Sequence, residues 1–197
     1  MNWPAKRLYL VASLIVAGVL LSGCGVNAIP TEEEQAKSAW SEVQNQYQRR
    51  ADLIPNLVAS VKGYATQERE VLTQVTEARA KATQTQVNVD QLTDPEALRR
   101  FQEAQAQVSG ALGRLLAISE NYPDLKSNQN FLALQSQLEG TENRIAVARR
   151  DYIQAVQTYN TDVRTFPGRL WAVVYSAKPM ATFTTNEQNQ RPPTVQF

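Results

Sequence analysis

The sequence predicts an all-α protein whose helices form an antiparallel up-and-down four-helix bundle. The first observation is composition: only 8 of the 197 residues are Gly, while the helix-favouring Ala, Leu, Gln, Glu and Arg are frequent. The second is periodicity, because apolar residues recur at spacings of three and four along the chain, which suits left-handed helix packing. The third is that short polar or proline-containing links separate the periodic segments, as expected between antiparallel neighbours.

The first predicted helix begins at Thr31. Thr31 and Glu34 have the spacing of a capping box, and the acidic residues 32–34 suit the positive end of a helix dipole. An apolar stripe then follows at helical spacing. Its members are Ala36, Trp40, Val43, Tyr47 and Ile54.

The stretch RRADLIPNLV, residues 49–58, places Pro55 inside this helical pattern. A proline in the interior of a helix removes one hydrogen bond and costs about 3 kcal/mol, whereas in the first turn its missing N–H has no helical partner to lose. With Asp52 as an N-cap, Pro55 would lie in a first turn. We therefore expect a tight turn at residues 50–52 and a new helix after it. A continuous helix kinked at Pro55 is the alternative.

The second helix is expected to run to about Ala82, where a polar stretch interrupts the pattern. Asp94 predicts the cap of the third helix, with Pro95 at its first position. This helix should end before Pro123, because the residue preceding a proline disfavours the helical conformation. The fourth and longest helix is predicted over about 125–165.

The C-terminal tail, residues 167–197, differs in composition from the helices and contains several prolines. Residues 170–175 are predicted to form a helical turn over one end of the bundle, and residues 182–197 to be extended or disordered. We expect three aromatic residues to close that end of the bundle. The alternative is an exposed apolar patch for a partner. These residues are Trp171, Tyr175 and Phe183.

The N-terminal 25 residues indicate an export signal. Lys6 and Arg7 precede an uncharged run over residues 8–21, which is typical of a signal peptide. The run ends in LSGC, which resembles the lipobox of bacterial lipoproteins, where a signal peptidase cuts before the cysteine and Cys24 would carry lipid. An uncleaved single-pass helix is the alternative, because residues 8–24 are uncharged and reach the lower limit of roughly 17–25 residues for a membrane span.

The expected organisation has four parts: a signal peptide or membrane anchor over 1–23, a tether over 24–30, the helical bundle over 31–166 and the tail over 167–197. The basic residues before the apolar run predict that the bundle lies on the extracytoplasmic face of a bacterial cell membrane. Gly25, rather than Asp, follows the cysteine, which favours the outer membrane if the source is Gram-negative.

The residue types present exclude several kinds of active site. The chain has no His and one Cys, so histidine-based acid–base catalysis, Ser-His-Asp and Cys-His arrangements and the usual zinc sites are excluded. Di-iron bundles also need histidine. The net charge of +1 gives no electrostatic case for nucleic acid. We expect no catalytic residue, no metal and no cofactor.

Two groups of polar residues are candidate sites. Arg49, Arg50, Asp52 and Asn56 would lie at the predicted junction of helices one and two, either as a polar docking surface or, as we favour, as local caps with an ion pair. The second group is expected to form a solvated face, and the alternative is an Arg–Glu pair inside the bundle that sets helix register. Its members are Glu77, Arg79, Glu142, Arg144, Arg149, Arg150 and Asp151.

The segment AWSEVQNQYQRRADLIPNLVASVKGYATQEREVLTQVTEARA, residues 39–80, resembles the LemA family. The stretch from Arg49 to Val58 matches the family motif residue for residue, and DYIQAVQTYNTDVRTFP and the Phe-ending tail are also similar. The resemblance covers about 35–197. It implies a bacterial, membrane-attached, up-and-down four-helix bundle without an established enzymatic activity. The chain departs from the family at its N-terminus, where LemA members usually carry an uncleaved transmembrane helix.

The resulting functional hypothesis is a membrane-anchored, extracytoplasmic helical bundle that is not an enzyme and has an interaction or scaffold role. Its expected partners are membrane lipid, through acylated Cys24 or a transmembrane helix, and an envelope protein that the sequence does not identify. An envelope enzyme or a ligand carrier with a pocket in the bundle is the alternative. Membrane remodelling by an inserted helix ranks last, because the polar faces are rich in Gln and mixed in charge. Periodicity alone does not determine the oligomeric state.

Overall fold

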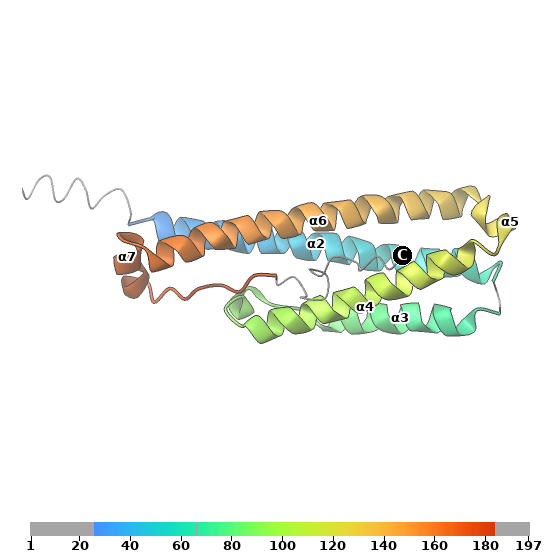
Figure 1. Cartoon of the computed structure of the whole chain (residues 1–197), viewed down its shortest axis with the longest axis horizontal. Helices are drawn as coiled ribbons and strands as arrows, with labels where there is room; N and C mark the ends of the chain where they lie inside the picture. The colour runs from blue at the N-terminus through green and yellow to red at the C-terminus, as the bar shows by residue number, and fades with distance from the viewer. Residues whose placement is uncertain (1–25, 66, 184–197) are drawn as a thin grey trace, which may run out of the picture.

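The structure, a computed structural model, describes residues 26–65 and 67–183 (Figure 1). The predicted all-α class is confirmed, since these residues form six α-helices, one 3-10 helix and no strand. The long helices are α2 (Ala28–Lys62), α3 (Arg69–Gln84), α4 (Pro95–Ser119) and α6 (Gln129–Arg164). The short elements are η1 (Val89–Gln91), α5 (Pro123–Lys126) and α7 (Gly168–Val174).

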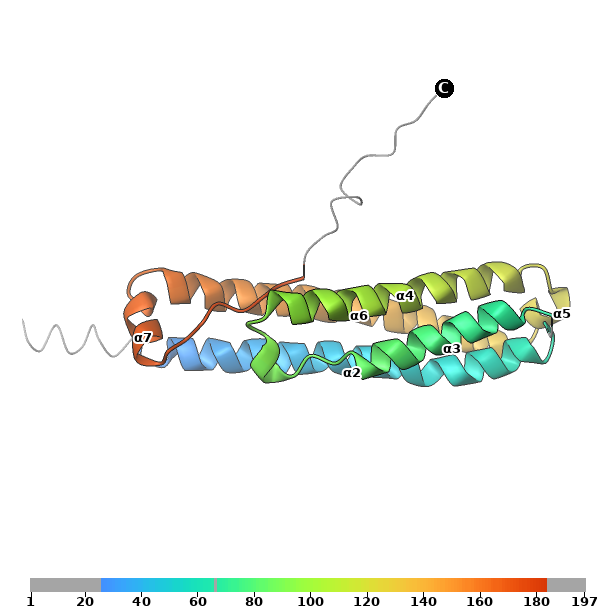
Figure 2. The same cartoon turned by 90° about the horizontal axis from the view of Figure 1, so that it is seen from below.

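The four long helices lie side by side, and successive long helices run in alternating directions (Figures 1 and 2). α2 packs mainly against α6, and α3 packs against both α4 and α2. α7 lies at the end where α2 begins and α6 finishes, and α5 lies at the opposite end (Figure 1). We call the four long helices the helical body, and its two ends the α7 end and the α5 end.

The start of α2 differs from the prediction. The helix begins at Ala28 with Asn27 in the N-cap position, so Thr31 lies inside the helix and the predicted capping box is wrong. Glu34 instead accepts a hydrogen bond from Lys37, one turn further on. Pro30 lies in the first turn, where a missing N–H removes no helical hydrogen bond. The helix can therefore start before Thr31, the residue from which we predicted it.

The preferred helix break at Pro55 is also wrong. α2 runs through Pro55 without interruption, and the chain leaves the helix only after Lys62. Asp52 therefore lies in the helix interior, where it accepts a hydrogen bond from Gln48 rather than capping a helix. The continuous helix, which was the alternative, is the observed arrangement. The prediction failed because it treated the hydrogen bond lost at the proline as uncompensated.

Helix α4 is bounded as the sequence predicts. The Asp94 side chain accepts a hydrogen bond from the backbone N–H of Glu96 at 2.9 Å, and Pro95 is the first helical residue. The helix ends at Ser119, before Pro123. The N-cap and the two prolines thus fix both boundaries of α4 through local chemistry.

The predicted fourth helix, 125–165, is divided in the structure. α5 ends at Lys126, and α6 begins at Gln129. The division is stabilised by Asn128, whose side-chain oxygen accepts hydrogen bonds from the backbone N–H groups of Asn130 and Phe131 at 3.0 and 3.1 Å. Asn is among the preferred N-cap residues, so the sequence carried this signal.

Because α3 ends at Gln84, two non-helical segments replace it in the α7 half of the body (Figure 2). The first follows α3, and the buried indole Nε1 of Trp40 donates a hydrogen bond to the backbone oxygen of Val87 at 2.9 Å. The second is the extended chain after α7, where the N–H of Ala181 donates to the backbone oxygen of Leu92 at 2.7 Å. The core of this half therefore contains non-helical segments, which the helical spacing of apolar residues does not predict.

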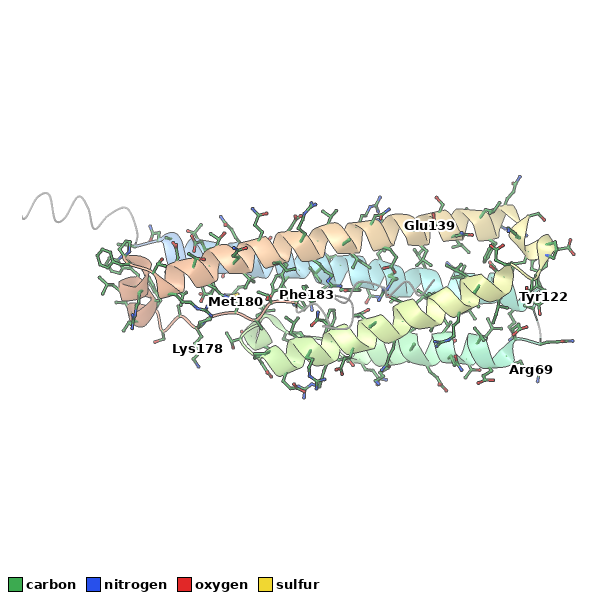
Figure 3. The ribbon with its side chains drawn as sticks, viewed as in Figure 1. Arg69, Tyr122, Glu139, Lys178, Met180 and Phe183 are labelled. Carbon is green, nitrogen blue, oxygen red and sulfur yellow. The ribbon has the colours of Figure 1, made fainter. Side chains whose placement is uncertain are left out.

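The extended segment 177–183 is held by side chains of α6. Asn160 donates to the Met180 carbonyl and accepts from the Met180 N–H, both at 2.8 Å, and the Tyr152 hydroxyl donates to the Ala181 carbonyl at 2.8 Å. Phe183 is buried, with its ring centroid 5.6 Å from that of Tyr152 (Figure 3). The segment is thus part of the core.

The three tail aromatics differ in their surroundings. Trp171 packs at the edge of the apolar cluster of the α7 end, as expected for closure of the bundle end. Phe183 is buried, but it packs along the body against Trp40 and Tyr152 rather than over its end, so the expectation is wrong for this residue (Figure 3). Tyr175 does not follow this expectation, because 43% of its surface is exposed. The short helix predicted at 170–175 is present as α7.

Candidate functional site: a buried arginine layer and the adjoining cavity

Arg50 is the most buried charged residue of the described chain, with 2% of its surface exposed. Its burial follows from its position, because Tyr47, Arg50, Ile54 and Leu57 recur at spacings of three and four on the inner face of α2. Tyr47 belongs to the apolar cluster of the α7 end, whereas Ile54 belongs to the cluster of the α5 end. Arg50 therefore lies between two separate hydrophobic cores.

The guanidinium group of Arg50 joins three helices. Its Nη1 donates to Ser109 Oγ on α4 and to Glu142 Oε1 on α6, both at 2.9 Å. Its Nη2 donates to the backbone and side-chain oxygens of Gln105 on α4, at 3.2 and 2.6 Å. We call Arg50, Gln105, Ser109 and Glu142 the Arg50 layer.

In the Arg50 layer, the buried cation of Arg50 is paired with the carboxylate of Glu142, which lies at the edge of the layer. Arg50 is almost fully buried, whereas 41% of the Glu142 side chain is exposed, so the carboxylate remains partly solvated. A buried charge needs such a partner, because an unpaired one is strongly destabilising. The Arg50 guanidinium also lies 5.0 Å from the ring centroid of Tyr47. Burial raises the pKa of the Tyr47 hydroxyl, and the charges of Arg149 and Arg50 oppose that rise.

A second arginine explains how α2 continues through Pro55. Proline has no N–H, so the carbonyl of Ala51, four residues earlier, has no donor within the helix. Arg79 of α3 supplies one: its Nε donates to the Ala51 oxygen at 2.6 Å. The hydrogen bond lost at the proline is thus replaced by a charge-assisted bond from the neighbouring helix.

The predicted cluster at residues 49–56 is placed differently from the expectation. Arg49, Asp52 and Asn56 are exposed and, at spacings of three and four, share one outer face of α2. Arg50 points away from them into the body. The structure therefore brings Arg50 together with α4 and α6, and leaves the other three residues on the surface.

The helix charges also divide into two groups. Arg144, Arg150 and Asp151 of α6 are exposed, in agreement with a solvated face. Glu142 instead pairs with Arg50, so an Arg–Glu pair between helices does form. Arg50 was not recognised as its cation, because Arg50 was assigned to a turn.

A cavity of about 220 Å³ lies beside the Arg50 layer, where α2, α3 and α4 meet. Two arginines, Arg50 and Arg79, contribute to its wall. Its lining also includes apolar side chains and several amides, and no carboxylate among the described residues lines it. The apolar side chains are Tyr47, Ala51, Ile54, Ala82, Phe101 and Val108, and the amides are Gln44, Asn45, Gln48, Gln86 and Gln105.

The predicted membrane anchor falls outside the described residues. Cys24, the predicted lipidation site, precedes the first described residue. None of the described helices is long and apolar enough to cross a membrane. Within residues 26–65 and 67–183, no group of three or more Cys, Asp or Glu residues is arranged to hold a metal ion.

The sequence model of the LemA family matches residues 39–197. Magnetosome protein MamQ 2 of Paramagnetospirillum magneticum is 24% identical over 206 aligned residues, which cover 96% of this chain and 76% of that protein. Magnetosome protein MamQ of Magnetospirillum gryphiswaldense is 25% identical over 197 residues, covering 91% of this chain and 72% of that protein. Protein LemA of Metamycoplasma hominis is 26% identical over 140 residues, covering 71% of this chain and 60% of that protein.

The pairing of Arg79 with the carbonyl of Ala51 predicts a thermodynamic coupling between Arg79 and Pro55. Arg79→Ala should lower the free energy of unfolding by about 1–2 kcal/mol, because the Ala51 carbonyl loses its donor. In a Pro55→Ala background the same substitution should cost less, because residue 55 then supplies its own N–H. Chemical denaturation of the four proteins of this double-mutant cycle measures the coupling.

Arg69→Ala provides the matched control, since Arg69 lies exposed at the start of the same helix (Figure 3). Surface substitutions of this kind usually change stability by less than about 0.5 kcal/mol. Equal costs of Arg79→Ala in the two backgrounds would show that Arg79 does not compensate for the proline.

Proposed function

Since the chain belongs to the LemA family, we propose that it is a membrane-anchored, extracytoplasmic four-helix bundle that performs no catalysis and binds other proteins of the bacterial envelope. The observation that carries this proposal is that the buried polar groups of the Arg50 layer bind one another across helices. The Arg50 guanidinium is directed at Gln105, Ser109 and Glu142, so it joins helices rather than facing a reacting group. The alternating directions of the long helices support the up-and-down bundle (Figure 2).

The proposed docking surface is the outer face of α2 that carries Arg49, Asp52 and Asn56. These side chains are exposed and lie on one helix face, and they present a cation, an anion and an amide to solvent. On the opposite side of the helix, the Arg50 layer joins α2 to α4 and α6. A helix fixed in this way that presents mixed polar groups suits recognition of another protein surface.

The proposed anchor is a lipid on Cys24, after removal of residues 1–23. The support comes from the sequence: a basic start, an uncharged run and the small residues Ser22 and Gly23 precede the single cysteine. Two or more acyl chains give stable membrane attachment, because each buried methylene contributes about 0.8 kcal/mol. Gly25 favours the outer membrane if the source is Gram-negative. An uncleaved transmembrane helix is the competing anchor.

Intact mass spectrometry of the full chain extracted from bacterial membranes tests the anchor. The expected mass is that of residues 24–197 plus lipid, and Cys24→Ala should lose both the lipid and the cleavage. Ser22→Ala, which keeps a small residue before the cysteine, is the matched control and should be processed normally. A full-length mass without lipid in the unmodified protein would show a transmembrane anchor instead.

A second candidate function is transport or sensing of a small anionic ligand, and the cavity beside the Arg50 layer favours it. Two arginines, several amides and aromatic or aliphatic side chains line the cavity without a carboxylate among the described residues. This combination fits a carboxylate with a small apolar body. The volume of about 220 Å³ is below the range of roughly 300–1,000 Å³ usual for ligand pockets, so only a small ligand fits.

Titration of the isotope-labelled protein with benzoate, followed by NMR, tests this second function. Saturable shifts of Phe101 and Val108 signals are expected, with weaker binding in Arg79→Gln and unchanged binding in Arg69→Gln. Benzamide, which has nearly the same shape without the charge, should bind more weakly. The absence of saturable shifts at millimolar benzoate would contradict the ligand-carrier function.

A further inference from the structure

Exposed apolar side chains gather at the α7 end of the described chain. Nine large hydrophobic residues are exposed in the described part of the chain, and five of them lie between residues 166 and 175. Four of them are strongly exposed, and we call these four the α7 apolar face. They are Phe166 at 82%, Leu170 at 60%, Val173 at 76% and Val174 at 69% exposed.

The inner side of α7 is fixed against the helical body. Ala172 is buried in the apolar cluster of the α7 end, and Trp171 packs against that cluster. Gly168 is also buried, and a Cβ atom at this position would lie 2.3 Å from the backbone oxygen of Asp162. This close approach of α7 to α6 requires glycine, and it directs the α7 apolar face outward.

The chain enters the helical body at this same end. α2 begins beside α7 (Figure 1), and Ile29 is fully buried in the cluster that contains Ala172. Cys24 precedes Ala28 by four residues, and four residues span at most about 14 Å when fully extended. A lipid on Cys24, or an apolar helix ending near it, is therefore covalently held close to the α7 end.

Exposed cations at the α7 end suit an interface with phospholipid headgroups. Arg164 and Arg169 are exposed there, and Lys178 follows on the extended segment 177–183. The same end also carries the carboxyl groups of Glu32 and Asp162, which interact with each other. Cations beside an apolar surface favour headgroup phosphates, and their aliphatic stems can lie along the apolar region. On the α2 side, Lys37 forms ion pairs with Glu33 and Glu34 at 2.8 and 3.0 Å, which reduces the repulsion between these carboxylates and anionic lipid.

We propose that the α7 apolar face lies in the surface of the lipid bilayer and forms a second membrane contact, in addition to the anchor. The inference rests on the proposed membrane anchoring, which brings this end of the body to the lipid. The short tether and the α7 contact together orient the protein, with the α7 end at the membrane and the α5 end farthest from it. The outer face of α2 then remains accessible to protein partners.

Site-specific fluorescence in vesicles tests the contact. The variants Val173→Cys and Leu132→Cys are labelled with the environment-sensitive fluorophore NBD in the full chain and reconstituted into phosphatidylethanolamine–phosphatidylglycerol vesicles. Leu132 is the matched control, because it is 47% exposed near the start of α6, at the α5 end. The protein without an added cysteine, treated in parallel, gives the background from Cys24. Both positions are exposed, so neither substitution should disturb folding, which thermal melting checks.

The expected result is a blue-shifted emission at position 173 and loss of most of its intensity when the lipids carry a nitroxide in the acyl chain. The label at position 132 should show neither effect. If the protein floats with vesicles but both labels respond alike, the α7 contact is excluded while the anchor stands. Shielding at 173 without quenching by the nitroxide lipid would show that a protein surface, such as a second copy, covers the face. Failure to float would exclude the anchor itself, and with it the contact.

Discussion

The buried guanidinium of Arg50 connects three helices, and the rest of the structure depends on this connection. Arg50 extends from α2 and binds Gln105 and Ser109 of α4 and Glu142 of α6. A shift of α2 or α6 by one turn would leave its charge unpaired, and a shift of α4 would remove its neutral hydrogen-bond acceptors. Hydrophobic packing alone tolerates such shifts better, because apolar contacts have little directionality. Buried polar groups are a recognised means of fixing helix register, at a cost in desolvation. The Arg50 layer has this geometry, since it separates two apolar clusters and crosses between helices.

Contacts from other parts of the chain stabilise the continuous helix α2 and complete the core beside it. The helix must pass Pro55, and Arg79 of α3 donates to the carbonyl that the proline leaves without a partner. α3 is short, so the chain segments around Val87 and Phe183 complete the core at the α7 end. The same end carries the exposed α7 apolar face and the entry of the chain, whereas the outer face of α2 stays polar. The α7 end thus differs in chemistry from the outer face of α2, as the proposed orientation at a membrane requires.

The sequence predicts what local chemistry determines. The all-α class follows from composition and periodicity, and the boundaries of α4 follow from Asp94 and Pro123. Pro55 could not be interpreted correctly, because its compensating donor lies on another helix. Arg50 could be recognised in retrospect by its spacing from Tyr47 and Ile54, but no local signal identifies its partners on α4 and α6. The burial of Phe183 depends on an extended segment whose contacts are all tertiary.

The most direct test of the central role of Arg50 is the coupling energy between Arg50 and Glu142 in unfolding. Glu142→Ala should lower the free energy of unfolding by about 1–3 kcal/mol, because it removes the carboxylate from a buried cation. In an Arg50→Met background, where no charge needs a partner, the same substitution should have little effect. Glu139→Ala, one turn away on the exposed face of α6, is the control for helix propensity (Figure 3). An equal cost of Glu142→Ala in both backgrounds would contradict the conclusion that Arg50 couples α2 to α6.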